Sequence, residues 1–266
     1  MHTERTLDGL AYHIEGTGAQ TIVLLHPAFA DRRAFGGQIL ALRDRYRLVA
    51  PDLPGHGNTK VLGKSVDPQP TMATAAEAIS DIFFAENIGS AHVVGVSMGA
   101  LVAEDFARRF PKLVRSLTVV GAYAVDDAVA IKAQRREMVR ILPMALFRLG
   151  RFKRYVAEAA AATDQGRQTM ARMLAGFKRS DLFGMKGLDA VMDPDRSDAL
   201  RCPLLIVVGR EDRTILHDAA HRWVAKVPGA EIQIFEGAGH CVNLDVPEAF
   251  NAALEAFVAR VDGEQR

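Results

Sequence analysis

The sequence is poor in cysteine, in charge of one sign and in long apolar runs. Two cysteines among 266 residues are too few for a disulfide scaffold. Lys and Arg number 33 against 32 Asp and Glu, so the basic excess typical of nucleic-acid-binding proteins is missing. No apolar run reaches the 18 residues of a membrane span, and the polar N-terminus has no apolar stretch of the signal-peptide kind. We therefore expect a cytoplasmic protein with neither a nucleic-acid nor a membrane partner.

The composition is that of a folded globular chain. Hydrophobic residues make up 49% and charged residues 24%. Short β-branched and Leu-rich runs predict strands at Leu10–Glu15, Thr21–Leu25, Arg47–Ala50, His92–Val96, Leu113–Val120, Pro203–Val208 and Glu231–Phe235. Helical patterns fall at Arg33–Arg43, Thr71–Asn87, Met98–Phe110, Ala219–Val227 and Pro247–Arg260. Strands that alternate with helices predict an α/β fold with a mostly parallel sheet.

This rhythm is interrupted at residues 123–192, where no strand-like run occurs. The segment is rich in Ala, Met, Leu and Arg and predicts several short helices between two strands of the sheet. We therefore divide the chain into a core of residues 1–122 and 193–266 and an insert of residues 123–192. The insert carries 13 Lys or Arg against 7 Asp or Glu. That excess indicates a solvated basic face or a preference for anionic substrates or an acidic partner.

A G-x-S-x-G pattern spans Gly95-Val96-Ser97-Met98-Gly99. Ser97 stands between a predicted strand and a predicted helix, which is the setting of a nucleophile elbow. The two glycines allow strand and helix to pack closely around the turn. A helix-capping serine is the structural alternative. A serine hydroxyl is a weak nucleophile near neutral pH and needs a neighbouring base.

His240 is the histidine best placed to be that base. It lies in Gly237-Ala238-Gly239-His240, after the last predicted strand, where side chains face the ligand site of an open α/β sheet. His217 and His221 share a helix face at i and i+4, but no third metal ligand accompanies them. We expect no metal and no organic cofactor, because zinc-type clusters and the phosphate-binding glycine loop are both missing from the sequence.

An acidic residue has to orient the histidine. Asp212 follows the strand before His240 and is the preferred candidate, with Glu211, Asp126 and Asp127 as alternatives. The chain order Ser97, Asp212, His240 matches one of the three common orders of a Ser-His-Asp triad.

With these residues the chain resembles the α/β-hydrolase superfamily, and in particular its small cap-bearing serine hydrolases of the esterase, perhydrolase and C–C hydrolase type. The resemblance extends from the His26 loop to the Asp245-x-Pro247 helix start. It rests on the Ser97 elbow together with His26-Pro27-Ala28-Phe29, Asp52-Leu53-Pro54-Gly55-His56-Gly57 and Gly239-His240. It implies a mostly parallel central sheet with helices on both faces, and it implies that the insert is a helical cap over the site.

The resemblance also implies an oxyanion hole made of two backbone N–H groups. One belongs to Met98, which follows the nucleophile, and the other to Ala28. Pro27 stands where the family usually has glycine, so Phe29 is the alternative second donor.

We expect a hydrolase that acts on a small or medium acyl compound, by preference a carboxylic ester, through an acyl-enzyme. Serine at position 97 disfavours the dehalogenases and epoxide hydrolases of this fold, which attack with aspartate. Lactonase, perhydrolase and C–C hydrolase activities share the triad and remain alternatives, as does a ligand receptor with this fold. Phe29, Tyr123 and Val242 are the candidate substrate-binding residues, and Cys241 is expected to be a packed side chain rather than a second nucleophile.

Overall fold

The computed structural model describes residues 3–7, 9–59 and 71–264. Among these residues, eight strands form one sheet in the order β1-β2-β4-β3-β5-β6-β7-β8. The strands are β1 (Thr3–Leu7), β2 (Leu10–Glu15), β3 (Thr21–Leu25), β4 (Arg47–Pro51), β5 (Ala91–Val96), β6 (Val114–Val120), β7 (Leu204–Gly209) and β8 (Glu231–Phe235). The β1–β2 and β2–β4 pairs are antiparallel and the remaining pairs are parallel. The predicted α/β fold with a mostly parallel sheet is confirmed.

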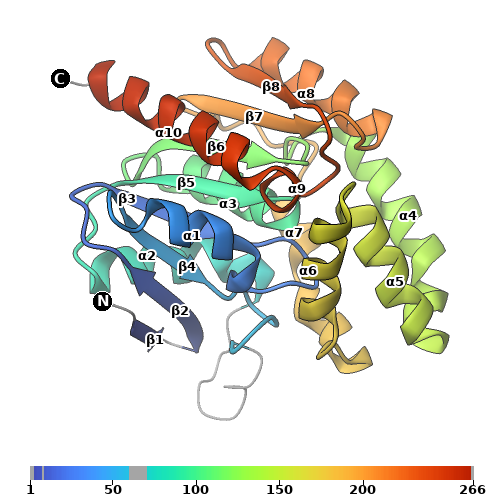
Figure 1. Ribbon diagram of the computed structural model, residues 1–266. Coiled ribbons are helices and arrows are strands. Elements are labelled where there is room, and N and C mark those ends of the chain that lie inside the picture. The colour runs from blue at the N-terminus through green and yellow to red at the C-terminus, as the bar shows by residue number, and fades with distance from the viewer. Residues whose placement is uncertain (1–2, 8, 60–70, 265–266) are drawn as a thin grey trace.

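Helices cover both faces of the sheet (Figure 1). The α-helices of the core are α1 (Gly36–Leu42), α2 (Ala75–Ala85), α3 (Met98–Arg109), α8 (Thr214–Lys226), α9 (Val242–Asp245) and α10 (Pro247–Glu264). Two 3₁₀ turns, η1 (Arg32–Phe35) and η2 (Met72–Thr74), precede α1 and α2. In β3, Ile22 and Leu24 pack on the side of α1 and α10, whereas Val23 and Leu25 pack on the side of α2, α3 and α8. Alternate residues of one strand thus fill two cores, which explains its continuous apolar sequence.

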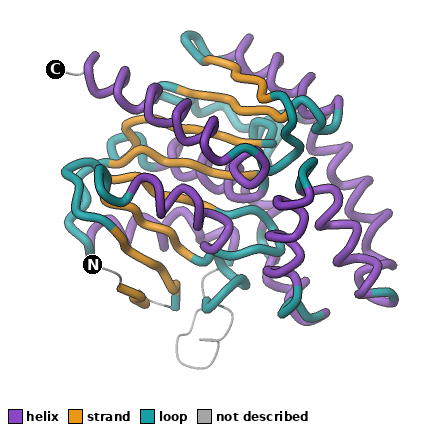
Figure 2. The backbone as a smooth tube through the Cα atoms, viewed as in Figure 1, coloured by secondary structure: helices purple, strands orange, loops and turns teal. Residues whose placement is uncertain are grey.

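The residues between β6 and β7 form helices and loops and no strand in the described chain. The helices are α4 (Ala128–Phe147), α5 (Leu149–Ala160), α6 (Asp164–Leu174), η3 (Arg179–Met185) and α7 (Leu188–Val191). Figure 2 shows these helices gathered beside one end of the sheet strands. The prediction of short helices was wrong for α4, which has 20 residues and continues through Pro143. Within the described residues, no helix combines the length and the apolar character of a bilayer span.

Candidate active site

Ser97 occupies the turn between β5 and α3. Its backbone has φ 53° and ψ −116°, a conformation that non-glycine residues rarely adopt. The Ser97 N–H donates to the Val120 carbonyl oxygen at 2.8 Å, which holds the turn against β6. A Cβ atom at Gly95 would collide with the first turn of α3, and one at Gly99 would collide with the Leu25 backbone. Both glycines are therefore required for strand and helix to approach this closely, as the motif predicts.

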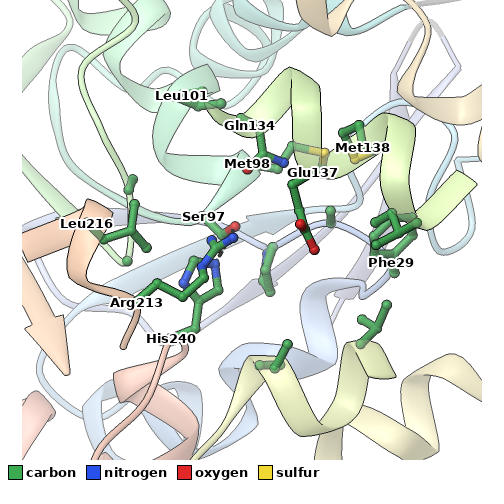
Figure 3. Close-up of a pocket in the computed structure, with 18 of the residues that line it drawn as sticks. Phe29, Ser97, Met98, Leu101, Gln134, Glu137, Met138, Arg213, Leu216 and His240 are labelled. Carbon is green, nitrogen blue, oxygen red and sulfur yellow. Dashed lines mark hydrogen bonds between the residues drawn. The ribbon is translucent and has the colours of Figure 1, made fainter. Parts of the chain in front are cut away.

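His240 and Asp212 reach Ser97 from two neighbouring loops (Figure 3 shows Ser97 and His240). The Nε2 atom of His240 lies 2.8 Å from Ser97 Oγ, and its Nδ1 atom lies 2.9 Å from Asp212 Oδ2. Asp212 follows β7 and His240 follows β8. The Glu211 N–H donates to the Ala238 carbonyl oxygen at 3.0 Å and ties the two loops together. The structure thus brings the three predicted residues into one hydrogen-bonded chain.

The charge of Asp212 determines which atoms donate and which accept in these two hydrogen bonds. Burial alone would raise the pKa of the Asp212 carboxyl, but the neighbouring His240 imidazole, their hydrogen bond and Arg213 hold that pKa below its usual value. Asp212 is therefore an anion that can only accept, so His240 donates from Nδ1. In the neutral imidazole with this tautomer, Nε2 is the nitrogen without a proton and can accept the hydroxyl hydrogen of Ser97.

The alternative acids lie elsewhere. Glu211 is exposed. Asp126 pairs with Arg108 and Lys226. Asp127 caps the start of α4, where its Oδ1 accepts the Ala130 N–H at 3.0 Å. Among the four acidic candidates, only Asp212 is hydrogen-bonded to His240 in the described structure.

The loop after β3 is held by His26. Its Nε2 atom accepts the Leu53 N–H at 2.9 Å, so its Nδ1 carries the proton and donates to the Pro27 carbonyl oxygen at 2.8 Å. Burial lowers the pKa of His26 to about 4, so the ring is neutral. The His26 and Asp52–Gly57 matches are structural. They connect the loops that follow β3 and β4.

Ala28 and Met98, the expected oxyanion donors, both line a cavity of about 550 Å³ that also contains Ser97 and His240. Phe29 lines it too and has φ 64°. The Phe29 ring packs edge-on against Phe152 and Phe177, with ring centroids 5.2 and 5.3 Å apart. The loop therefore adopts a constrained conformation beside Ser97.

The cavity wall is mainly apolar and comes from both the core and the insert. Leu101, Met138, Ile141, Val156, Met170 and Leu216 are among its lining residues. Tyr123 lines the cavity as expected, and its hydroxyl lies 3.2 Å from Met192 Sδ. Val242 is buried in the core and is not among the described lining residues, whereas its neighbour Cys241 is. Burial raises the pKa of the Cys241 thiol, which disfavours a reactive thiolate.

Sequence reasoning missed several residues of the site. Asp245 is the most connected of them: it accepts the N–H groups of Gly239, Ala162 and Thr163, each at 2.8 Å. One carboxylate thus ties the His240 loop to the start of α6. Glu137 and Arg213 point into the cavity (Figure 3), and a hydrogen bond to Arg140 is the main cause that lowers the pKa of Glu137 to about 2. Across the described residues, no three His, Cys, Asp or Glu side chains are grouped as metal ligands. The His217 and His221 pair therefore has no third such ligand beside it among these residues.

A family model described as the alpha/beta hydrolase family matches residues 22–253. The chain is 28% identical over 265 residues to a 2-hydroxy-6-oxononadienedioate/2-hydroxy-6-oxononatrienedioate hydrolase of Burkholderia vietnamiensis, a match that covers 94% of this chain and 90% of that protein. It is 30% identical over 274 residues to the dihydrolipoyllysine-residue acetyltransferase component of an acetoin cleaving system of Cupriavidus necator, covering 94% of this chain and 67% of that protein.

Among solved structures, a thermophilic esterase from Thermogutta terrifontis superimposes with a TM-score of 0.74. The identity is 22%, and the match covers 98% of this chain and 99% of that one. At this identity the likeness concerns the fold.

Proposed function

The chain belongs to the alpha/beta hydrolase family, and from that membership we propose that it is a serine hydrolase that cleaves a small or medium acyl compound, by preference a carboxylic ester. One observation carries the proposal: Ser97, His240 and Asp212 form a continuous hydrogen-bonded chain that opens into an apolar cavity. A buried carboxylate, an oriented imidazole and a hydroxyl are the parts that acyl transfer to serine requires.

In the first half of the reaction, Ser97 Oγ attacks the substrate carbonyl carbon while His240 Nε2 takes the hydroxyl proton. Asp212 holds the ring with Nδ1 protonated and stabilises the imidazolium that forms. The strained backbone of Ser97 keeps the hydroxyl at the turn, within reach of the base.

Negative charge develops on the carbonyl oxygen in the tetrahedral intermediate. We assign its stabilisation to the backbone N–H groups of Met98 and Ala28, which flank Ser97 in the cavity wall. The N–H of Phe29 is the alternative to that of Ala28. Loss of one such donor costs about 3 kcal/mol of transition-state stabilisation.

The first intermediate collapses when its C–O bond to the alcohol breaks, and His240 returns the proton to the departing alcohol oxygen, which leaves acyl-Ser97. In the second half, water loses a proton to His240 while its oxygen attacks the acyl-Ser97 carbonyl carbon. The second intermediate collapses when the bond to Ser97 Oγ breaks, so that the acid is released and His240 returns the proton to Ser97 Oγ. No step needs a group from outside the chain other than water.

The cavity supports the size of substrate that we propose. Its volume of about 550 Å³ lies in the range typical of small-molecule sites, and its lining is mainly apolar. We also propose that the insert acts as a cap, because α4, α5 and α6 contribute residues to the cavity wall. The expected cytoplasmic location stays a prediction.

C–C bond cleavage is the second candidate. The Burkholderia vietnamiensis relative is named as a hydrolase of an oxo-dienedioate, and the match covers most of both chains. The same three residues would serve that reaction, so the identity of Ser97 does not separate the two. Lactone opening and perhydrolysis are further variants of the same chemistry.

A substrate panel tests the choice. Nitrophenyl esters of increasing acyl length, a lactone series and a 2-hydroxy-6-oxo-dienoate would be offered to the wild-type chain and to Ser97→Ala. We expect the highest kcat/KM for an ester of short or medium chain length, and loss of this activity in Ser97→Ala. Efficient cleavage of the dienoate with negligible ester turnover would favour the second candidate.

A further inference from the structure

One face of α4 exposes large apolar side chains to solvent. Val139 and Phe147 are 73% and 78% exposed, and Leu142 and Leu146 are 43% and 41% exposed. Their spacing along the helix places them on one side, and they are called here the α4 apolar face. Among the described residues, the other exposed large hydrophobics are Val129 at the start of the same helix, Leu40 on α1 and Phe84 on α2. The exposure is therefore concentrated on α4 and is not scattered over the molecule.

Positive charge surrounds this face. From Ala128 to Ala160, across α4 and α5, the sequence has eight Lys or Arg residues and two Asp or Glu residues. The net charge of the whole chain is +1, so the rest of the molecule is net acidic. The exposed cations of this stretch are Lys132, Arg135, Arg136, Arg140, Arg148, Arg151 and Arg154. The surface is amphipathic and strongly basic within an almost neutral protein.

The α4 apolar face adjoins the catalytic cavity. Val139 belongs both to this face and to the residues that line the cavity, so it stands at the cavity rim. Figure 3 shows Gln134, Glu137 and Met138 of α4 at the cavity, and Val139 follows Met138 in the sequence. In Figure 1, α4 and α5 lie side by side on the outer side of the insert, away from the sheet. Anything that covers the apolar face therefore also lies beside the way into the cavity.

We propose that the α4 apolar face docks on the surface of an anionic phospholipid bilayer. Phe and Leu side chains on an interfacial helix enter the boundary between headgroups and acyl chains, while Arg side chains meet the lipid phosphates. The arrangement on α4 and α5 has both parts. Docking would turn the cavity rim toward the lipid, so that an amphiphilic acyl compound enters along an apolar path. This inference replaces the expectation that the protein has no membrane partner, and it does not depend on the ester chemistry proposed above.

Other occupants fit the charges less well. In a symmetric dimer the same patch faces itself, so the cations of one copy would be set against those of the other. A protein partner usually meets an interface whose centre is depleted of charge, whereas Arg140, which follows Val139 in the chain and pairs with Glu137, keeps its side chain 66% exposed. An anionic lipid surface satisfies the apolar and the basic residues together.

The test is co-sedimentation of the purified full chain with vesicles of phosphatidylcholine, with and without phosphatidylglycerol. We expect binding that requires phosphatidylglycerol and weakens as salt is added. Phe147→Ser removes the most exposed aromatic side chain of the face and should weaken binding about tenfold. Arg148→Gln/Arg151→Gln removes two exposed cations and should weaken it by about tenfold as well.

Matched controls lie outside the insert. Phe84→Ser removes an aromatic side chain that is 88% exposed on α2, and Lys112→Gln/Arg201→Gln removes two exposed cations of the core. Both should bind vesicles as the wild type does. Circular dichroism checks the fold of every variant. Because the assay measures vesicle binding and not turnover, its result does not depend on which substrate the enzyme takes.

Three results would overturn the proposal. The first is a wild-type chain that does not sediment with phosphatidylglycerol vesicles. The second is an equal loss of binding in Phe84→Ser and Phe147→Ser. The third is a dimer in light scattering that Phe147→Ser converts to a monomer, which would make the face a contact between copies of this chain.

Discussion

Gly121 lies directly against His240. A Cβ atom at position 121 would stand 2.9 Å from His240 Nδ1 and closer still to the His240 carbonyl oxygen. Gly121 follows β6, has φ 57°, and donates its N–H to the Val207 carbonyl oxygen at 3.0 Å. The end of one strand thus forms the wall against which the imidazole is placed. The position has no room for a side chain and has a backbone conformation that favours glycine.

We therefore expect Gly121→Ala to displace His240 and to lower kcat by at least about 100-fold. Gly229→Ala is the matched control, because Gly229 also has positive φ but a Cβ atom there would meet no heavy atom within 4 Å. Both variants carry the backbone cost of about 1 kcal/mol, and only Gly121→Ala meets the histidine. Steady-state kinetics and urea unfolding of both variants separate the two effects. Equal loss of kcat in both would contradict this role of Gly121.

Replacement of the orienting acid gives a second prediction. Asp212→Asn keeps the shape of the side chain but removes the charge that holds His240 with Nδ1 protonated. We expect kcat to fall about 10⁴-fold with little change in KM. Glu211→Gln, at the exposed neighbouring position, should leave kcat within about twofold of the wild type. A large effect of Glu211→Gln would move the assignment to that residue.

The acyl length preference should depend on Phe29. Its ring lines both the catalytic cavity and a second cavity of about 420 Å³, which Arg32, His56 and Asn58 also line. We expect the Phe29 side chain to separate the two cavities, so that Phe29→Ala joins them. The ester with the highest kcat/KM in a nitrophenyl ester series should then have a longer acyl chain than in the wild type. Phe29→Leu keeps most of the side-chain bulk and should keep the wild-type order. An unchanged order in Phe29→Ala would mean that the partition does not limit chain length.

Because His26 is buried, we expect the free energy of unfolding to depend on pH. Burial lowers its pKa in the folded chain to about 4, from an ordinary value of 6.5. Between these values the unfolded state binds more protons, so the free energy of unfolding falls as the pH decreases from 6.5 to 4, by about 3 kcal/mol in total. Glu104 has the opposite effect, since burial raises its folded-state pKa to about 7 from 4.5 and favours the folded state at the lower pH.

Urea unfolding of the wild type and of His26→Gln across this pH range separates the two groups. The difference in stability between the two proteins should shrink as the pH falls, because the variant lacks the buried imidazole. A difference that stays constant from pH 7 to pH 4 would rule out a buried neutral His26 as its source.

The central strands could be predicted because they consist of short runs of β-branched residues and Leu, which is typical of buried strands. β2, β3 and β8 have the predicted bounds, and the other predicted strands are correct to within one residue at each end. β1 was missed, since Thr3–Leu7 is a mostly polar antiparallel edge strand without an apolar run. The predicted start of this helix at Ala219 was too late, because α8 begins at Thr214.

Some residues of the candidate site could likewise be predicted from the sequence and others could not. The proximity of Ser97, Asp212 and His240 could be predicted because each lies in a short motif at the end of a predicted strand. Gly121 and Asp245 could not, because their contacts join loops that are far apart in the sequence. The misplacement of Val242 has a similar cause: Cys241 and Val242 are adjacent at the start of α9, but only Cys241 is among the residues that line the cavity.

The role of Ser97 as the nucleophile is tested most directly by the intact mass of the chain after reaction with a fluorophosphonate probe, in the wild type and in Ser97→Ala. We expect one adduct on the wild type and none on Ser97→Ala, together with release of nitrophenol from short-chain esters by the wild type alone. An adduct that persists in Ser97→Ala, or ester turnover that survives the substitution, would contradict Ser97 as the nucleophile.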